Sequence, residues 1–306
     1  MSLLTVGSVA FDALETPFGK TDKIIGGAAT YITLSASYFT NQNNLVAVVG
    51  GDFPQTMIDT LVNHGVNVDG LEIRPGEKTF FWSGKYHNDM NSRDTVDVQL
   101  NVMEKFDPII PESYQDCTYL MLGNTAPAIQ HLVIKRLAKR PKLIVLDTMN
   151  LWIEIANADL KALLPDVDVL VLNDEEARQL TGDYSLVRAA ATIKGMGPKT
   201  VIIKKGEHGA LLFHEDQIFA APALPLESVF DPTGAGDTFA GGFIGHIANT
   251  DDISFDNMKR AVIYGSAMAS FCVEKFGAER IMNLSKAEIQ DRIDQFVKLS
   301  AFSVEM

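Results

Sequence analysis

Two aspartates and two glycines late in the chain have the spacing of a phosphate-handling loop. Residues 231–237 read DPTGAGD and run directly into a helical pattern. Gly234 and Gly236 permit backbone angles closed to other residues, and neither carries a side chain that would keep a ligand away. The first N–H groups of a helix lack intrahelical partners and lie at the positive end of its dipole, so they form a site for an anion such as phosphate. Asp237 falls in the first helical turn, where its carboxylate could accept a proton beside that anion. The pattern therefore favours phosphoryl transfer over phosphate binding alone.

The stretch resembles the C-terminal signature of the ribokinase-like (PfkB) family of carbohydrate and nucleoside kinases. The resemblance implies that Asp237 is the catalytic base and that Gly234, Ala235 and Gly236 form the anion hole. The alternative interpretation is an ordinary helix start, in which Asp237 complements the dipole and the glycines only make a turn. Two acids at a fixed spacing around PTGAG are more specific than a lone Gly-x-Gly, so we favour the kinase interpretation.

The composition of the 306-residue chain excludes several other classes of protein. A formal charge of −13 argues against a partner nucleic acid or an anionic membrane, because both require a basic surface. The first six residues lack the positive start of a signal peptide, and the longest uncharged apolar run, residues 261–273, is shorter than the ~20 residues that span a bilayer. Cys117 and Cys272 lie far apart, without the spacing of a disulfide framework or a metal site, which fits a reducing, cytoplasmic compartment. The sequence also contains no Walker-type P-loop.

The loop at residues 231–237 must be positioned by the rest of the chain, in which short apolar runs alternate with helical patterns. Continuous hydrophobicity is typical of parallel strands covered on both faces, and intervening helices predict right-handed crossovers. We therefore expect an α/β fold with a doubly wound, mostly parallel sheet, and one domain over residues 1–306. The expected strands are residues 3–6, 45–49, 119–122, 143–146, 169–172 and 201–203.

Small or polar residues follow each of these runs, and the carboxyl ends of parallel strands meet at one edge of a sheet, where ligands bind. Asp12 only accepts hydrogen bonds when ionised, so it could hold two hydroxyls of a polyol. An Asp at the matching place binds substrate hydroxyls in the resembled family. Asn124 and Asn150 are further candidates for substrate binding. The alternative for each residue alone is an ordinary loop side chain.

Gly26 and Gly27 resemble the family's N-terminal di-glycine motif, where the glycines flex as a lid closes and a nearby Asn touches the sugar. Thr30 and Tyr31 stand here in place of that Asn, which argues against transferring ribose or fructose specificity. Tyr31 either offers a hydroxyl or a ring to the substrate or is a core residue.

Two further motifs are candidates for nucleotide and metal binding. Asn173 and Glu176 have the spacing of a capping box, and the family has an Asn-x-x-Glu motif here that orders Mg²⁺, water and nucleotide phosphates. The turn that contains Gly206 and Gly209 resembles the family's nucleotide-binding turn, and Lys204 before it could meet a phosphate. Exposed turn lysines without such a role are the alternative.

Residues 71–101 break the alternation of strands and helices. They contain two segments rich in strand formers, and in the second of them Val96, Val98 and Leu100 alternate with polar residues. We expect a small β-sheet lid, as in the resembled family, that covers the substrate, pairs with a second subunit in a homodimer, or does both.

These observations predict an ATP-dependent kinase that phosphorylates an alcohol, such as a hydroxymethyl group, of a small sugar-like substrate. The resemblance implies Mg²⁺ ordered by Glu176 through water, Thr233 beside the nucleotide, and a monovalent cation such as K⁺ at Asp231. Two alternatives stay open: a nucleoside kinase of the same fold, and a nucleotide-binding regulator without turnover.

Overall fold

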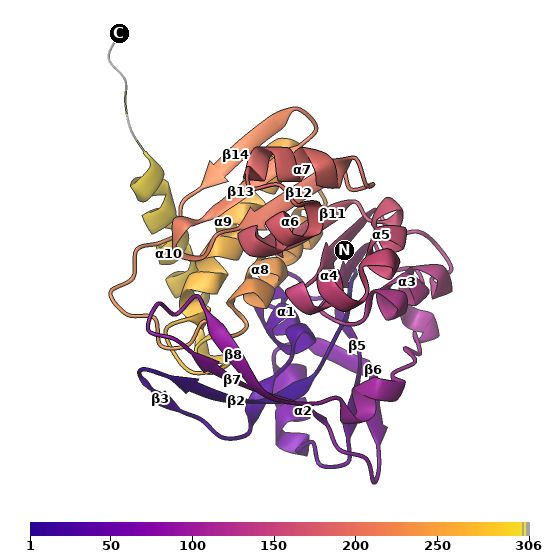
Figure 1. Ribbon diagram of the computed structural model, residues 1–306. Coiled ribbons are helices and arrows are strands. Elements are labelled where there is room, and N and C mark those ends of the chain that lie inside the picture. Colours follow the sequence, from indigo (N-terminus) through magenta and orange to yellow (C-terminus); the bar gives the residue numbers. More distant parts are fainter. Residues whose placement is uncertain (302, 304–306) are drawn as a thin grey trace.

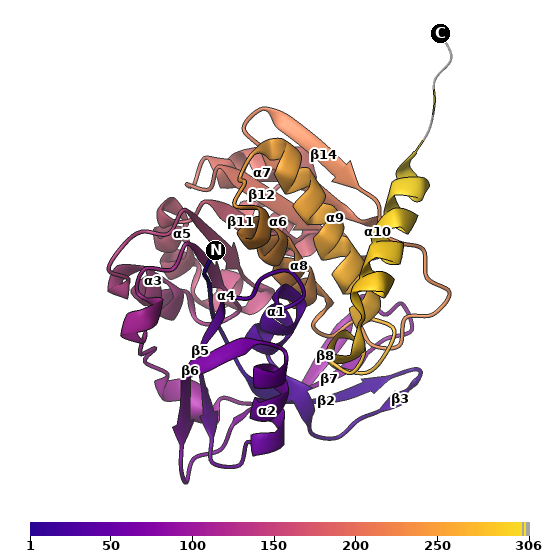
Figure 2. The ribbon, with the colours of Figure 1, turned by 180° about the vertical axis from the view of Figure 1, so that it is seen from behind.

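The computed structural model describes residues 1–301 and 303, and its main body is a nine-stranded sheet between two layers of helices (Figures 1 and 2). The order across the sheet is β14-β13-β12-β11-β10-β9-β1-β5-β6. All neighbours from β6 to β12 are parallel, whereas β13 and β14 run antiparallel at one edge. The strands are β1 (Leu3–Val6), β5 (Asn43–Gly50), β6 (Val66–Arg74), β9 (Tyr119–Leu122), β10 (Leu143–Asp147), β11 (Val169–Asn173), β12 (Thr200–Lys204), β13 (Ala210–His214) and β14 (Gln217–Ala221).

Helices cover both faces of this sheet, which is why its central strands are apolar without alternation. One face carries α3 (Pro127–Arg136), α4 (Asn150–Ile155), α5 (Asn157–Leu163), α6 (Asp174–Thr181) and α7 (Leu186–Lys194). The other face carries α1 (Ala28–Ala36), α2 (Gln55–Asn63), α8 (Ala235–Thr250) and α9 (Phe255–Cys272), with α10 (Lys286–Ser300) packed against α9 (Figure 2). The predicted doubly wound fold is confirmed, and the six predicted strands occur with ends within two residues of the prediction. No helix in the described residues has the length and apolarity needed to cross a bilayer.

A second, five-stranded sheet forms the lid below the main body in Figure 1. Its order is β3-β2-β7-β8, and β4 pairs with β2. The strands are β2 (Ala10–Thr16), β3 (Gly19–Lys20), β4 (Ile24–Gly26), β7 (Phe80–Tyr86) and β8 (Arg93–Gln99). The predicted lid, residues 71–101, therefore needs correction at its start and in its membership. Residues 71–74 belong to β6 of the main sheet, and three strands come from residues 10–26, because β2 leaves the main sheet directly after β1.

One edge of the lid is β8, whose residues are all exposed. The register between β7 and β8 shifts at Val96, so the alternation expected along this strand is interrupted there. The homodimer through the lid and the single domain over residues 1–306 stay predictions.

Candidate active site

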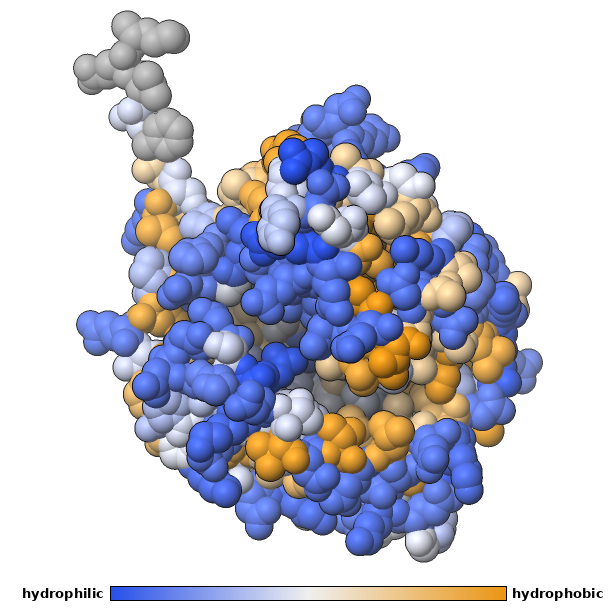
Figure 3. Space-filling model, viewed as in Figure 1, coloured by the Kyte–Doolittle hydropathy of each residue, from blue (hydrophilic) through white to orange (hydrophobic). Residues whose placement is uncertain are grey.

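The loop before α8 and the carboxyl ends of β10, β11 and β12 lie on the side of the main sheet that faces the lid. The molecular surface is hollowed between the lid and the helices above it (Figure 3). The lid also contacts the main body directly. The Phe18 ring of the β2–β3 turn lies 5.0 Å from the Phe230 ring, and the Thr233 hydroxyl donates a hydrogen bond to the Tyr86 hydroxyl oxygen at 3.1 Å.

The start of α8 leaves several main-chain N–H groups free for an anion. Gly234 caps the helix with φ +74°, in the left-handed region that favours glycine. The Ala235 N–H donates to the Pro232 carbonyl at 3.2 Å. The N–H groups of Gly234, Gly236 and Asp237 have no acceptor among the described residues. Three of the four amides around the predicted anion hole are therefore unpaired, and the Ala235 amide is the exception.

Tyr31 lies directly beneath this loop in α1. Its side chain is 1% exposed, and a Cβ at Gly234 would lie 2.4–2.5 Å from three of its ring carbons. Of the two alternatives for Tyr31, this burial supports the core residue, because the ring packs under residues 231–236, which we call the anion loop. The Tyr31 hydroxyl has no hydrogen-bond partner in the described part of the chain, and burial, followed by nearby Asp12, raises its pKa well above the usual value.

Asp237 is partly buried at the centre of a cluster of charged groups. The pKa of Asp237 is raised to about 7; burial is the main cause and Asp147 adds to it, whereas Lys204 and Arg93 oppose the rise. The Lys204 ammonium lies 3.3 Å from Asp147 Oδ1, and it would lie 2.8 Å from a Cβ placed on Gly236. The cluster therefore puts a carboxylate of near-neutral pKa and a largely buried cation beside the free amides, an arrangement suited to proton acceptance next to an anion.

Lys204 reaches Asp147 across the end of an intervening strand. Asn173 of β11 pairs in register with Lys204 of β12, and β11 separates β12 from β10, which ends at Asp147. Burial alone would lower the Lys204 pKa, but Asp147 and Glu176 raise it overall, so the lysine is charged at neutral pH. Asp147 was not among the predicted site residues, although its position directly after a buried strand was the available signal.

Asn173 and Glu176 form the expected capping box at the start of α6. Asn173 Oδ1 accepts from the Glu176 N–H, and Glu176 Oε2 accepts from the Asn173 N–H, both at 2.7 Å. Burial raises the pKa of Glu176 to about 7. The second oxygen, Oε1, accepts no hydrogen bond from the described residues, so it remains able to accept one from a metal-bound water. Nowhere in those residues do three His, Cys, Asp or Glu side chains gather to hold a metal.

Asp231 is fully buried and orders the approach to the anion loop. Its Oδ1 accepts from the Thr233 N–H at 2.9 Å, and its Oδ2 accepts from the Gly277 N–H at 2.8 Å. Each oxygen retains a lone pair, so Asp231 can supply one ligand to a cation, and the other ligands would have to be main-chain carbonyls.

Asp12 lies on β2 at the inner face of the lid and is 5% exposed. Burial raises its pKa to about 8, with smaller contributions from Asp231 and Asp237, which places these carboxyl groups near one another. Its carboxyl group fills the space where Gly26 would carry a side chain, since a Cβ there would lie 2.0–2.6 Å from the carboxyl atoms. Gly27 caps α1 at φ +88°.

The remaining predicted residues are less central. Asn124 is occupied by protein, because the Trp152 indole N–H donates to its Oδ1 at 2.7 Å and its amide contacts Met149 Sδ at 2.9 Å. The structure therefore does not support a free Asn124 side chain for the substrate. Asn150 is exposed at the start of α4. Gly206 begins the short 3₁₀ turn η4 (Gly206–His208) near the lid residue Asn91, and Gly209 follows the turn.

Comparison with known proteins identifies the family. Residues 4–284 match the family described as pfkB family carbohydrate kinase. The chain belongs to the PfkB family of kinases. A cytidine kinase of Thermococcus kodakarensis is 33% identical over 250 residues, which cover 80% of this chain and 87% of that protein. A nucleoside kinase of Methanothermobacter thermautotrophicus is 25% identical over 298 residues, which cover 90% and 91% of the two chains.

Several solved structures have the same fold. A nucleoside kinase of Methanocaldococcus jannaschii, an archaeal member of the ribokinase family, superposes with a TM-score of 0.77 at 20% identity, covering 96% of this chain and 99% of that one. A Vibrio cholerae fructokinase bound to fructose, ADP and potassium gives 0.78 at 18% identity, with 96% and 98% covered. A ribokinase-like protein of E. coli bound to ATP and Mg²⁺ gives 0.77 at 20% identity, with 97% and 99% covered. These likenesses confirm the ribokinase fold.

Proposed function

We propose that this PfkB kinase transfers the γ-phosphoryl group of ATP to the hydroxymethyl group of a nucleoside. The likeness to the cytidine kinase over 80% of the chain carries the choice of acceptor. The sugar-like acceptor, which the sequence alone favoured, becomes the second candidate, supported by a fructokinase of Oryza sativa that is 24% identical over 84% of the chain and 81% of that protein.

Asp237 would accept the proton of the acceptor hydroxyl. The acceptor oxygen forms a new bond to the γ-phosphorus as the bond to the bridging oxygen breaks, and ADP leaves with that electron pair. The transition state is loose, so a strong base is not required, and a carboxylate with a pKa of about 7 suits the task. The free N–H groups of Gly234 and Gly236 would hold the charge of the transferred group.

Lys204, positioned by Asp147, would also contact the negative charge of the transferred phosphoryl group. Lys204 is close enough to Gly236 to contact an anion bound there, and its pairing with Asp147 limits where the ammonium can go. Asp12, beside Gly26 and Gly27, would bind acceptor hydroxyls from the lid.

The residues present also fit the expected ions. One oxygen of Glu176 is fixed by the capping box, and the other is available to a water ligand of Mg²⁺. Because the protein would then contact Mg²⁺ only through water, most of the direct ligands would come from the nucleotide phosphates and water. When bound, Mg²⁺ would neutralise part of the negative charge of the phosphates. Asp231 could contribute one ligand to K⁺ beside Thr233, and Gly206 and Gly209 would let the nucleotide approach the main chain.

A substrate panel tests the acceptor. Purified protein with ATP and Mg²⁺ should consume ATP with cytidine or another nucleoside and yield the nucleoside monophosphate, while ribose and fructose give less than a tenth of that rate. Turnover with sugars alone would refute the nucleoside assignment. If neither nucleosides nor sugars are phosphorylated, the result would favour a nucleotide-binding regulator without turnover.

Asp237→Asn tests the base, because it keeps the size of the side chain and removes the ionisable carboxyl group. We expect a loss of about 10²–10⁴-fold in kcat with ATP affinity retained. Asp256→Asn is a matched control, since Asp256 also lies in the first turn of a long helix but away from the cleft. Near-normal turnover by Asp237→Asn would contradict the assigned role.

A further inference from the structure

The inner face of the lid presents four side chains toward the anion loop. Asp12 of β2 pairs in register with Trp82 of β7, and Tyr86 of β7 pairs with Arg93 of β8. Paired residues point to the same face of a sheet, and residues two or four apart along a strand do so as well. Because the Tyr86 hydroxyl contacts Thr233 of the anion loop, Arg93 belongs to the face that looks into the cleft.

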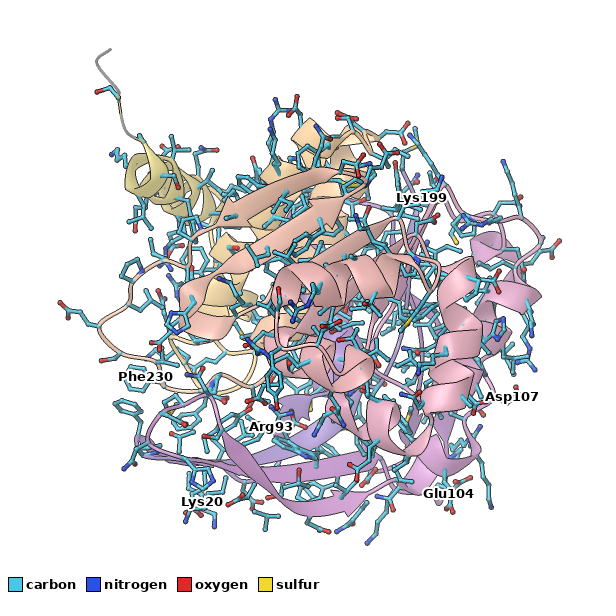
Figure 4. All side chains as sticks on the ribbon, turned by 45° about the horizontal axis from the view of Figure 1, so that its top comes forward. Lys20, Arg93, Glu104, Asp107, Lys199 and Phe230 are labelled. Carbon is cyan, nitrogen blue, oxygen red and sulfur yellow. The ribbon has the colours of Figure 1, made fainter. Side chains whose placement is uncertain are left out.

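Arg93 lies beside an aromatic ring and has no carboxylate partner among the described residues. Its guanidinium lies 5.8 Å from the centroid of the Trp82 ring. The Trp82 indole lies flat against the main chain of the lid, since a Cβ at Gly84 would be 2.1 Å from the ring. Within the described residues no carboxylate oxygen lies within 4.0 Å of Arg93, whereas neighbouring Lys85 on the opposite face is 2.6 Å from Glu15. Figure 4 shows Arg93 between the lid strands and the helices of the main body.

Across the hollow from the lid, the main body offers no unpaired cation among the described side chains of the cluster around Asp237. Three carboxylates lie there, on Asp147, Glu176 and Asp237, and the buried cation among them, Lys204, is already paired with Asp147. Arg93 acts on this cluster across the hollow, because its charge lowers the pKa of Asp237. A nucleotide polyphosphate would add negative charge to the site, and the exposed guanidinium of the lid is the cation best placed to meet it.

We propose that Arg93 is a catalytic residue supplied by the lid, whose guanidinium contacts the phosphoryl group during transfer. This inference rests on the kinase reaction proposed above, but not on the identity of the acceptor. A guanidinium offers two parallel N–H donors to phosphate oxygens, and its charge is permanent. Because Arg93 is carried by the lid, transfer would depend on the lid being packed on the body as it is in this structure, which would limit wasteful hydrolysis of ATP before an acceptor is bound.

The test compares Arg93→Gln, Arg93→Lys and the control Lys85→Gln, each assayed with the best acceptor found in the panel. Lys85→Gln removes the same charge from the same lid on its outer face, where the side chain is 55% exposed. We expect Arg93→Gln to lower kcat by about 10²–10³-fold, which is at or below the lower end of the effects known for arginines at transferred phosphoryl groups. Arg93→Lys should recover part of the loss, and Lys85→Gln should stay within twofold of wild type.

Two further readouts separate catalysis from a structural role. The affinity for ATP without acceptor should change less than threefold in Arg93→Gln, because the proposed contact forms during transfer. The acidic limb of the pH–rate profile should move to higher pH, since removing Arg93 raises the pKa of Asp237. Equal losses in Arg93→Gln and Lys85→Gln, a kcat within threefold of wild type, or a loss confined to ATP affinity would each overturn the proposal. If the best acceptor is a sugar, the nucleoside assignment fails while this comparison still decides the role of Arg93.

Discussion

Lys204→Met and Asp147→Asn should move the pKa of Asp237 in opposite directions. In the structure, burial is the main cause of the raised value of about 7, Asp147 adds to it, and Lys204 opposes it. Loss of the cation therefore raises the pKa of Asp237. Loss of Asp147 lowers it, both by removing a negative neighbour and by releasing Lys204 from its partner.

The size of the change follows from the effect of a nearby unit charge, which is about one to two pH units for partly buried groups. With a pKa of about 7, roughly half of Asp237 is ionised at pH 7 and roughly a tenth at pH 6. A rise of one to two units in Lys204→Met would reduce the ionised fraction at pH 7 by about five- to fiftyfold. The proton-accepting step should slow at least in proportion, because Lys204 is also proposed to bind the phosphoryl group.

The assay is a ¹³C NMR titration of ligand-free protein labelled at the aspartate carboxyl carbons, with Asp237→Asn used to assign the resonance. Because neighbouring carboxylates titrate together, the measured midpoint belongs to the cluster around Asp237, and the direction of change is the diagnostic quantity. A wild-type midpoint below about pH 5, or shifts of the same sign in Lys204→Met and Asp147→Asn, would refute the electrostatic reasoning.

Two other substitutions have matched controls in the chain. Gly234→Ala should lower the free energy of unfolding by about 2–5 kcal/mol in urea denaturation, because the positive φ and the overlap with the Tyr31 ring both disfavour a Cβ atom. Gly182 is the control: its φ is +77° and nothing lies within 4 Å of an added Cβ, so Gly182→Ala should cost about 1 kcal/mol. Equal losses in the two variants would contradict the overlap with Tyr31. Glu176→Gln should retain the capping box and most of the stability but require several-fold more Mg²⁺ for half-maximal rate, whereas Glu288→Gln in the capping box of α10 should leave the Mg²⁺ requirement unchanged.

Predictions that depended on neighbouring residues in the chain were the most successful. The central strands were found from their continuous apolar runs, and the capping box of Asn173 and Glu176 was found from its spacing. The free amides before α8 were also expected, since they follow from a glycine-rich helix start. In the described part of the chain the Gly234 and Gly236 amides have no acceptor, whereas the Ala235 amide is paired.

Predictions about which distant side chains meet were weaker. Asn124 follows a strand as expected, but Trp152 and Met149 occupy its amide. Tyr31 lies in the core rather than against a substrate, because α1 packs beneath the anion loop. The lid recruits β2, β3 and β4, and no local pattern in residues 10–26 indicates that these strands leave the main sheet.

The sequence by itself determined the α/β architecture, the glycine-rich start of α8 and the carboxylate in its first turn, because helix starts, strand burial and glycine geometry are set by residues close together in the chain. Only the tertiary structure decided that Lys204 pairs with Asp147 across β11, that Arg93 faces the cleft, and that the relevant carboxyl groups have near-neutral pKa values. These properties depend on strand order, register and burial, which bring charges from distant segments into one water-poor space.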